Sequence, residues 1–206
     1  MIRKIAAIAA ALGALSLGSP AAIAATAGPH AAPAARTAAL VSEDRALIAQ
    51  QVRGLLKYNH GATQVASNAV RYKGAILGVS LLGASRSFGP ESESGVCPNN
   101  YVCLFQNDNF NENGGRFIGA WIDFYKCDVN YDLYDYTLPS GGGSWGDQAS
   151  SIDYPGSPSS NEAKFNHDGN WWLYLYRDHY LRDLATDGGP SPHGNSNDWI
   201  TGLYAC

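Results

Sequence analysis

Apolar side chains recur at helical spacing in one stretch of the N-terminal half. The positions that form this stripe are Leu47, Ile48, Val52, Leu55 and Leu56. Ser42 precedes them as a good N-cap, Glu43 and Asp44 complement the helix dipole, and Gly61 ends the pattern. The sequence therefore predicts one amphipathic helix, which we expect to dock on the folded domain through its apolar stripe. A removable pro-segment is the alternative interpretation.

The spacing of apolar residues changes from helical to alternating after Gly61. Alternating positions lie on both sides of Lys73-Gly74, namely Ala66, Val70 and Tyr72 before it and Ala75, Leu77, Val79 and Leu81 after it. Such alternation around a short turn that contains glycine predicts a β-hairpin. Helix and hairpin together make up residues 42–82. The next residues, 83–96, are turn-formers without a period, which predicts a linker.

Short aromatic and β-branched runs separated by polar turns dominate the chain from Cys97 to Cys206. Strands are predicted at residues 101–106, 116–121 and 171–176, with an Asn/Gly-rich turn at 107–115. One order of features occurs twice: an aromatic strand, a polar turn, a longer excursion, and then an acidic or amide residue followed by a hydroxyl residue. The sequence therefore predicts a mainly β domain, residues 97–206, built from two similar halves.

The N-terminus has the features of a secretory signal peptide. Basic residues precede an apolar run from Ile5 to Leu17 that is too short to span a bilayer, and Ala22-Ile23-Ala24 offers a cleavage site. This predicts a signal peptide at residues 1–24. Residues 25–41 are rich in Ala, Pro and Gly with few large apolar side chains, which predicts a flexible leader. We expect a secreted, extracellular protein without membrane association once the signal is removed.

Charge and cysteine content narrow the classes of partner. The net charge of −4 has the wrong sign for a general nucleic-acid binder, so no nucleic-acid partner is expected. In an oxidising compartment an even number of cysteines predicts disulfides rather than metal ligands or a catalytic thiol. Four cysteines permit three pairings, and the sequence does not choose among them. Loop geometry favours Cys97 with Cys103 and Cys127 with Cys206.

Familiar catalytic motifs are absent from the sequence. There is no His-Glu-x-x-His zinc motif, no Gly-x-Ser-x-Gly nucleophile elbow, and no phosphate-binding lysine after the glycines at 141–143. In the neighbouring pairs His167-Asp168 and Asp178-His179, an extended backbone would point the two side chains to opposite faces. We therefore expect a non-enzymatic protein that requires no cofactor.

Aromatic residues are concentrated in the predicted β domain. The prominent group is Tyr131, Tyr134, Tyr136, Trp145, Trp171, Trp172, Tyr174 and Tyr176. The interpretation that we favour is core packing. Alternation along residues 172–176 places three of these rings on one face, which would be a binding patch for protein or glycan if that face were open.

Several motifs occur in an order that resembles a known family. They are Cys97-Pro98-x-x-Tyr101-Val102-Cys103-Leu104-Phe105, Asn109-Phe110, Gly114-Gly115 and Asp147-x-x-Ser150-Ser151, preceded by Gly61-Ala62-Thr63-Gln64-Val65. Together with the signal peptide, this series resembles the secreted actinobacterial peptidase inhibitors of family I36. The resemblance implies a βγ-crystallin-like double Greek-key sandwich at residues 97–206, preceded by one amphipathic helix and a β-hairpin. We expect a monomer.

The resemblance also implies a function. Such proteins inhibit an extracellular peptidase, here expected to be a metallopeptidase, through a loop that occludes the active site. The candidate interaction loop is the long excursion that carries Tyr131, Tyr134, Tyr136 and Trp145. The chain departs from the family pattern in two ways: no closely spaced cysteine pair follows Cys103, and the excursion is enlarged.

The βγ-crystallin signature gathers acidic, amide and hydroxyl oxygens in an arch, a donor set that suits Ca²⁺. The residues at these positions are Asp147 and Ser150 in the first copy and Asn197, Asp198 and Thr201 in the second. They are candidate calcium ligands, although Gly146 replaces the first Asn/Asp of the first copy. Alternatively, they satisfy backbone groups at turns. Two alternative functions follow: a calcium-binding structural or stress module, and a secreted antimicrobial protein on the same scaffold.

Overall fold

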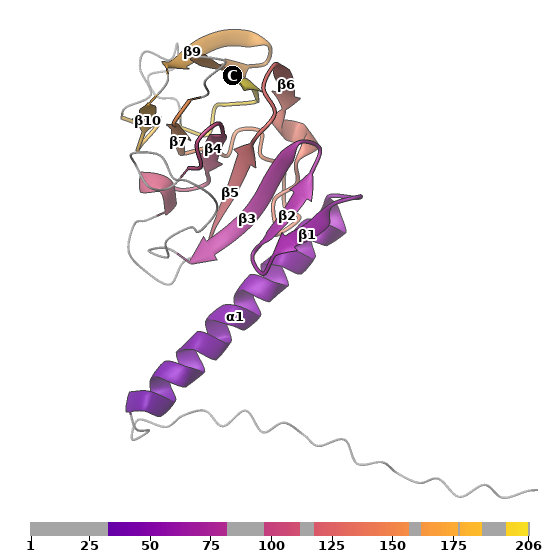
Figure 1. The fold of residues 1–206 in the computed structure, drawn as a ribbon, viewed down its shortest axis with the longest axis vertical. Coiled ribbons are helices and arrows are strands. Elements are labelled where there is room, and N and C mark those ends of the chain that lie inside the picture. Colours follow the sequence, from indigo (N-terminus) through magenta and orange to yellow (C-terminus); the bar gives the residue numbers. More distant parts are fainter. Residues whose placement is uncertain are drawn as a thin grey trace, which may run out of the picture. The chain divides into compact units, whose positions relative to one another are not determined.

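The computed structural model describes residues 33–81, 97–111, 118–156, 162–176, 178–186 and 197–205. The predicted signal peptide, the start of the predicted leader and the predicted linker lie outside these residues. The chain divides after residue 39 into two units. Of the first unit only the beginning of helix α1 is described. The second unit, Leu40–Cys206, contains all the strands among the described residues (Figure 1).

Helix α1 spans Pro33–Tyr58, so it begins well before the predicted N-cap Ser42. This corrects the expectation that the flexible leader runs to residue 41. Proline is pre-organised for the first turn of a helix, and the residues after Pro33 include several alanines, which have the highest helix propensity. Adding such residues to a helix that is anchored further along costs little, because nucleation is the expensive step.

The second half of α1 packs against the strands, as its apolar stripe predicts. Val52 and Leu55 are 3% and 1% exposed, and Ile48 and Leu56 contact the same core. Leu47, in contrast, is 39% exposed. The docking interpretation is therefore confirmed for the part of the stripe nearest the helix end.

Three short strands follow the helix: β1 (Thr63–Ala66), β2 (Ala69–Tyr72) and β3 (Ala75–Leu81). The predicted hairpin is present as β2 and β3, and its turn residues Lys73 and Gly74 have φ values of 44° and 84°. Two consecutive residues with positive φ suit a tight turn between twisted antiparallel strands. Ala66 belongs to the separate strand β1, so the segment is a three-stranded meander rather than one hairpin.

The meander continues a sheet of the C-terminal half. The order of this seven-stranded sheet is β1-β2-β3-β5-β4-β7-β10. Its other strands are β4 (Val102–Phe105), β5 (Ile118–Phe124), β7 (Ser151–Tyr154) and β10 (His179–Leu181). Strand β3 pairs with β5 along its whole length, and the two lie side by side in Figure 1. The segment predicted as an extension is thus part of one continuous antiparallel sheet.

The second sheet has four strands in the order β6-β11-β8-β9. They are β6 (Val129–Asp132), β8 (Glu162–His167), β9 (Asn170–Tyr176) and β11 (Gly202–Ala205). The two sequence halves exchange one strand each. Strand β6 of the first half pairs with β11, and β10 of the second half pairs with β7. Two 3-10 helices, η1 (Asn109–Asn111) and η2 (Leu133–Asp135), complete the described elements.

The main core draws on both sheets and on helix α1. Its largest fully buried members are Phe124, Trp145, Tyr154, Phe165, Leu55, Leu77, Leu104, Ile122, Leu133 and Ile152. A smaller cluster on the other face of the seven-stranded sheet joins Trp121, Phe105, Phe110, Ala69, Cys97 and Cys103. Within it, the ring of Trp121 covers Gly78 so closely that a Cβ at residue 78 would collide with the indole.

Candidate functional site

The two predicted signature segments lie against each other as a reciprocal pair of arches. Asp147 and Asp198 both have a left-handed backbone, with φ values of 58° and 51°. The N–H of Asp147 donates to the carbonyl of Ile200 at 2.9 Å, and the N–H of Asp198 donates to the carbonyl of Ala149 at 3.1 Å. Because each aspartate bonds to the residue two positions after the other aspartate, the arches are related by a local twofold arrangement.

The hydroxyl residues tie each arch to the first strand of its own half. Ser150 Oγ donates to the carbonyl of Gln106 at 2.9 Å, and Thr201 Oγ1 lies 3.4 Å from the carbonyl of Asn166. Thr201 Oγ1 also accepts a bond from the N–H of Asp168 at 2.8 Å. These bonds satisfy backbone groups at the strand ends, as the turn interpretation of the motif expects.

Charged and aromatic groups surround Asp147. Tyr134 donates its hydroxyl to Asp147 Oδ2 at 2.8 Å, and this hydrogen bond raises the pKa of Tyr134 to about 12. His167 Nδ1 lies 3.5 Å from Asp147 Oδ1, but its closer partner is the carbonyl of Trp199 at 2.9 Å. A carbonyl only accepts, so Nδ1 carries the proton and donates to it. The imidazole also stacks on the Trp199 ring at 4.2 Å.

His167 and Asp168 lie closer together than the sequence predicts. His167 Nε2 is 3.6 Å from Asp168 Oδ2. Strand β8 ends at His167 and Asp168 has a φ of 48°, so the two side chains do not alternate as they would on an extended backbone. The imidazole therefore lies between two carboxylates, those of Asp147 and Asp168.

Two side-chain oxygens of the arches have no hydrogen-bond partner although they are shielded from solvent. They are Asp147 Oδ1 and Asn197 Oδ1. Partial burial raises the pKa of Asp198, the nearby Ser150 hydroxyl lowers it, and repulsion by Asp147 raises it further. The backbone bonds between the arches thus bring together the two segments that carry the five predicted ligands. Among the described residues, no group of three His, Cys, Asp or Glu side chains could hold a metal ion.

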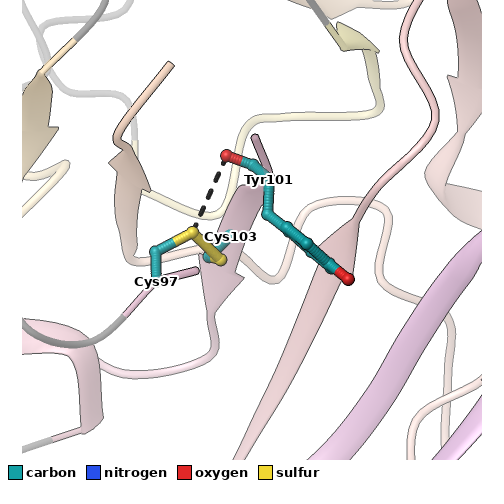
Figure 2. Close-up of a disulfide and its surroundings, with 3 residues drawn as sticks. All are labelled: Cys97, Tyr101 and Cys103. Carbon is teal, nitrogen blue, oxygen red and sulfur yellow. Dashed lines mark hydrogen bonds between the residues drawn. A yellow bond between two sulfur atoms is a disulfide. The ribbon is translucent and has the colours of Figure 1, made fainter. Parts of the chain in front are cut away.

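The sequence prediction for the first disulfide is confirmed. Cys97 and Cys103 are bonded, their Cα atoms are 5.9 Å apart, and both side chains are buried. Figure 2 shows the bridge closing the turn, with Cys97 Sγ 3.7 Å from the carbonyl oxygen of Tyr101. Cys127 is disulfide-bonded as well. Its predicted partner, Cys206, lies outside the described residues.

Most of the aromatic candidate loop is core. Tyr131, Tyr136 and Trp145 are 6%, 2% and 0% exposed, so these three cannot touch a partner in the folded protein. The core-packing interpretation is therefore confirmed for these three rings, and the expectation that they belong to an interaction surface is wrong. Tyr134 is exposed, but its hydroxyl is bound to Asp147. The excursion contributes strand β6 and helix η2 to the fold, and its tyrosine rings pack against one another and Phe124.

The predicted excursion also contains a hairpin at residues 137–144. Thr137 and Ser144 form a β-bridge, the N–H of Leu138 donates to the carbonyl of Gly143 at 3.0 Å, and the N–H of Gly141 donates to the carbonyl of Leu138 at 2.9 Å. The tip, residues 140–143, is exposed. This segment is therefore a hydrogen-bonded turn with an exposed tip.

Helix α1 holds the base of this hairpin through Asn59. The Asn59 side chain, 1% exposed, donates from Nδ2 to the carbonyl of Thr137 at 2.9 Å and accepts from the N–H of Thr137 at 2.8 Å. Its Nδ2 also donates to the carbonyl of Leu55 at 3.0 Å. The backbone at Gly54 touches Pro139 so closely that a Cβ there would collide with its carbonyl. An asparagine just after a predicted helix is a weak sequence signal, and its partner lies 78 residues away.

The outer face of strand β9 is partly open. Tyr174 and Tyr176 are 43% and 57% exposed, so the core-packing interpretation is wrong for these two rings. Trp172 does pack against the core and lies 5.0 Å from the Trp199 ring. The exposed tyrosines are near polar groups, since Lys164 Nζ lies 5.9 Å from the centre of the Tyr174 ring.

No protein-family model, curated protein or solved structure matches this chain. Among the described residues, no helix is both long enough and apolar enough to cross a membrane.

Proposed function

We propose that this protein is a secreted inhibitor of an extracellular metallopeptidase and that the hairpin at residues 137–144 occludes the active-site cleft. The observation that carries the proposal is the clamp of Asn59 on Thr137, which fixes an exposed loop to the end of a docked helix. A loop that is already ordered loses less entropy when it binds, which is what an inhibitor that resists turnover requires.

The topology supports a βγ-crystallin-like assignment for the C-terminal half. In each half, the last strand lies beside the first, and the first pairs with the second: β7-β4-β5 in one sheet and β11-β8-β9 in the other. The third strand of each half joins the opposite sheet, which is the arrangement expected of two Greek keys that form one sandwich. The reciprocal arches at Asp147 and Asp198 stand at the equivalent point of each half.

Secretion is supported by the predicted signal peptide and by the disulfide Cys97–Cys103, because stable disulfides form in oxidising compartments. N-terminal sequencing of the protein recovered from culture medium tests this part of the proposal. Recovery of the chain only inside cells, with its first 24 residues still attached, would contradict it.

Inhibition is tested by titrating the secreted protein against a thermolysin-type metallopeptidase and measuring residual hydrolysis of a short fluorogenic peptide. We expect activity to fall in proportion to the inhibitor added until the two proteins are equimolar. A serine peptidase serves as the control and should keep its activity. Unchanged activity across a panel of metallopeptidases of different specificity would refute the proposal.

Calcium binding at the arches is the second candidate function, and the shielded oxygens Asp147 Oδ1 and Asn197 Oδ1, which accept no hydrogen bond, favour it. A cation bound by Asp147 or Asp198 would relieve the repulsion between these two carboxylates. We expect the melting temperature to rise with calcium relative to chelator, and Asp147→Asn to reduce that rise. Identical melting curves in calcium and in chelator would exclude this function.

A further inference from the structure

A polar pocket of about 350 Å³ lies beside the arches, at one end of the four-stranded sheet. Its lining comes from strands β6, β8 and β11, from helix η2 and from the turn after β8. Asp132 on β6 and Asn166 on β8 both pair with Gly202, which lies between them on β11. Because glycine has no side chain, the outer face of the sheet is hollowed at this point.

Tyr134 forms one wall of the pocket, and its ring is held in place from two sides. Its hydroxyl donates to Asp147 Oδ2 at 2.8 Å, and its ring lies so close to Gly146 that a Cβ there would collide with it. Gly146 stands where the other arch has Asn197, so the small residue in the first arch makes room for the ring. The side chain of Tyr134 nevertheless remains 52% exposed. A fixed and exposed ring of this kind can stack against a ligand in the pocket.

The lining also carries amide and carboxylate groups that the fold does not use fully. The side-chain oxygen of Asn166 accepts the N–H of Gly169 at 3.3 Å, whereas its Nδ2 donates to no other described residue. Asp132 Oδ1 accepts the N–H of Tyr134 at 2.9 Å, and Oδ2 accepts no bond from the described residues. The Asn130 side chain makes no hydrogen bond within the described part of the chain. The pocket therefore presents both donors and acceptors beside an aromatic ring.

This set of groups narrows the class of ligand. No lysine or arginine of the described residues lines the pocket, and the carboxylates of Asp132 and Asp168 would repel an anion. None of the described lining residues is aliphatic apart from its glycines, which disfavours an apolar ligand. A neutral sugar ring carries hydroxyl groups around its edge and C–H groups on its faces. It therefore matches a pocket that combines donors, acceptors and an aromatic surface.

We infer that this pocket binds a neutral saccharide, with one sugar ring stacked on Tyr134 and its hydroxyl groups bonded to Asp132 and Asn166. The volume is at the lower end of the range for small-ligand sites and suits roughly one or two sugar rings. The pocket shares no residue with the hairpin at 137–144, so the inference does not depend on the proposed inhibitory function. Through this pocket the protein would attach to a polysaccharide.

The test is a calorimetric titration of the protein, in chelator, with short oligosaccharides of glucose, mannose, galactose and N-acetylglucosamine. We expect at least one of them to bind with a Kd below about 1 mM. The side-chain NH₂ signals of Asn130 and Asn166 should shift in NMR spectra recorded during the titration. Sorbitol offers hydroxyl groups without a ring face, so it serves as the ligand control and should bind at least about 10-fold more weakly.

Variants locate the binding site. Tyr134→Ala removes the stacking ring and Gly146→Asn displaces it, so each should weaken binding by about 10-fold. Asn130→Ala breaks no hydrogen bond of the described fold and should weaken binding roughly 5-fold. The matched control is Tyr180→Ala, which removes a tyrosine that is 45% exposed on strand β10 of the other sheet, and it should bind like wild type. Melting curves verify that each variant is folded.

Three results would overturn the inference. The first is that none of the oligosaccharides binds, or that sorbitol binds as tightly as they do. The second is that Tyr134→Ala and Asn130→Ala bind as tightly as wild type, which would place the sugar elsewhere on the protein. The third is that the pocket variants weaken peptidase inhibition while no saccharide binds, which would assign the pocket to a protein partner instead.

Discussion

Replacing Asn59 by alanine should loosen the hairpin at residues 137–144 and destabilise the whole domain. The Asn59 side chain makes three hydrogen bonds of 2.8 to 3.0 Å, two of them to the backbone of Thr137. Alanine leaves the N–H and the carbonyl of Thr137 without these partners in a half-buried position. The contact between the helix end and the excursion then depends on packing alone.

The expected magnitude follows from the groups left unsatisfied. Each buried donor or acceptor that loses its partner costs about 1–3 kcal/mol, and water partly replaces the bonds at a half-buried site, so we expect a loss of about 3 kcal/mol. For a domain of this size, such a loss lowers Tm by roughly 6–12 °C. Hydrogen exchange at the Thr137 amide should accelerate more than global unfolding explains, because the hairpin also opens locally.

Urea unfolding and amide exchange measured by NMR provide the assay. The matched control is Asn130→Ala, an exposed asparagine on strand β6, which should change stability by less than about 0.5 kcal/mol. Asn59→Asp keeps an acceptor for the Thr137 N–H but turns a buried carboxylate oxygen toward the carbonyls of Leu55 and Thr137, so at neutral pH it should destabilise the protein at least as much as alanine does. A stability for Asn59→Ala within error of the Asn130→Ala control would refute the clamp.

Three further predictions concern the scaffold and its charges. Removing the disulfide by replacing Cys97 and Cys103 with alanine should cost about 2 kcal/mol by loop entropy, read from the urea midpoint, and an unmoved midpoint would contradict it. Gly78→Ala should cost about 1–3 kcal/mol, because the methyl group collides with Trp121, whereas Gly143→Ala should cost nothing measurable. The pKa of Asp198 is raised in the folded state, so the folded protein keeps this proton in a pH range where the unfolded chain has lost it. Asp198 therefore favours folding at low pH, and this contribution to stability is lost as the pH rises through the folded-state pKa. Asp198→Asn should therefore raise Tm at neutral pH but not below the ordinary aspartate pKa of about 3.9, and an equal change in Tm at both pH values would show that its charge is not responsible.

Local features of this protein were predictable from the sequence because they depend on neighbouring residues. The period of the apolar residues predicts the docked part of helix α1 and the hairpin turn at Lys73-Gly74, both of which the structure contains. The short spacing of Cys97 and Cys103 predicts their bond. The signature spacing also identifies Asp147 and Asp198 as turn residues, and both have the left-handed backbone that aspartate tolerates at turns.

Long-range relations were decided only by the tertiary structure. The sequence allows the tyrosines of the excursion to be either core residues or interaction residues. The pairing of β6 with β11 in the opposite sheet buries Tyr131, and Tyr136 is buried in the same core. Nothing near Asn59 in the sequence indicates Thr137 as its partner. Local periodicity indicates which side of a helix or strand is apolar. Which other element covers that side depends on the strand order and on contacts between distant segments, and only the folded chain establishes these.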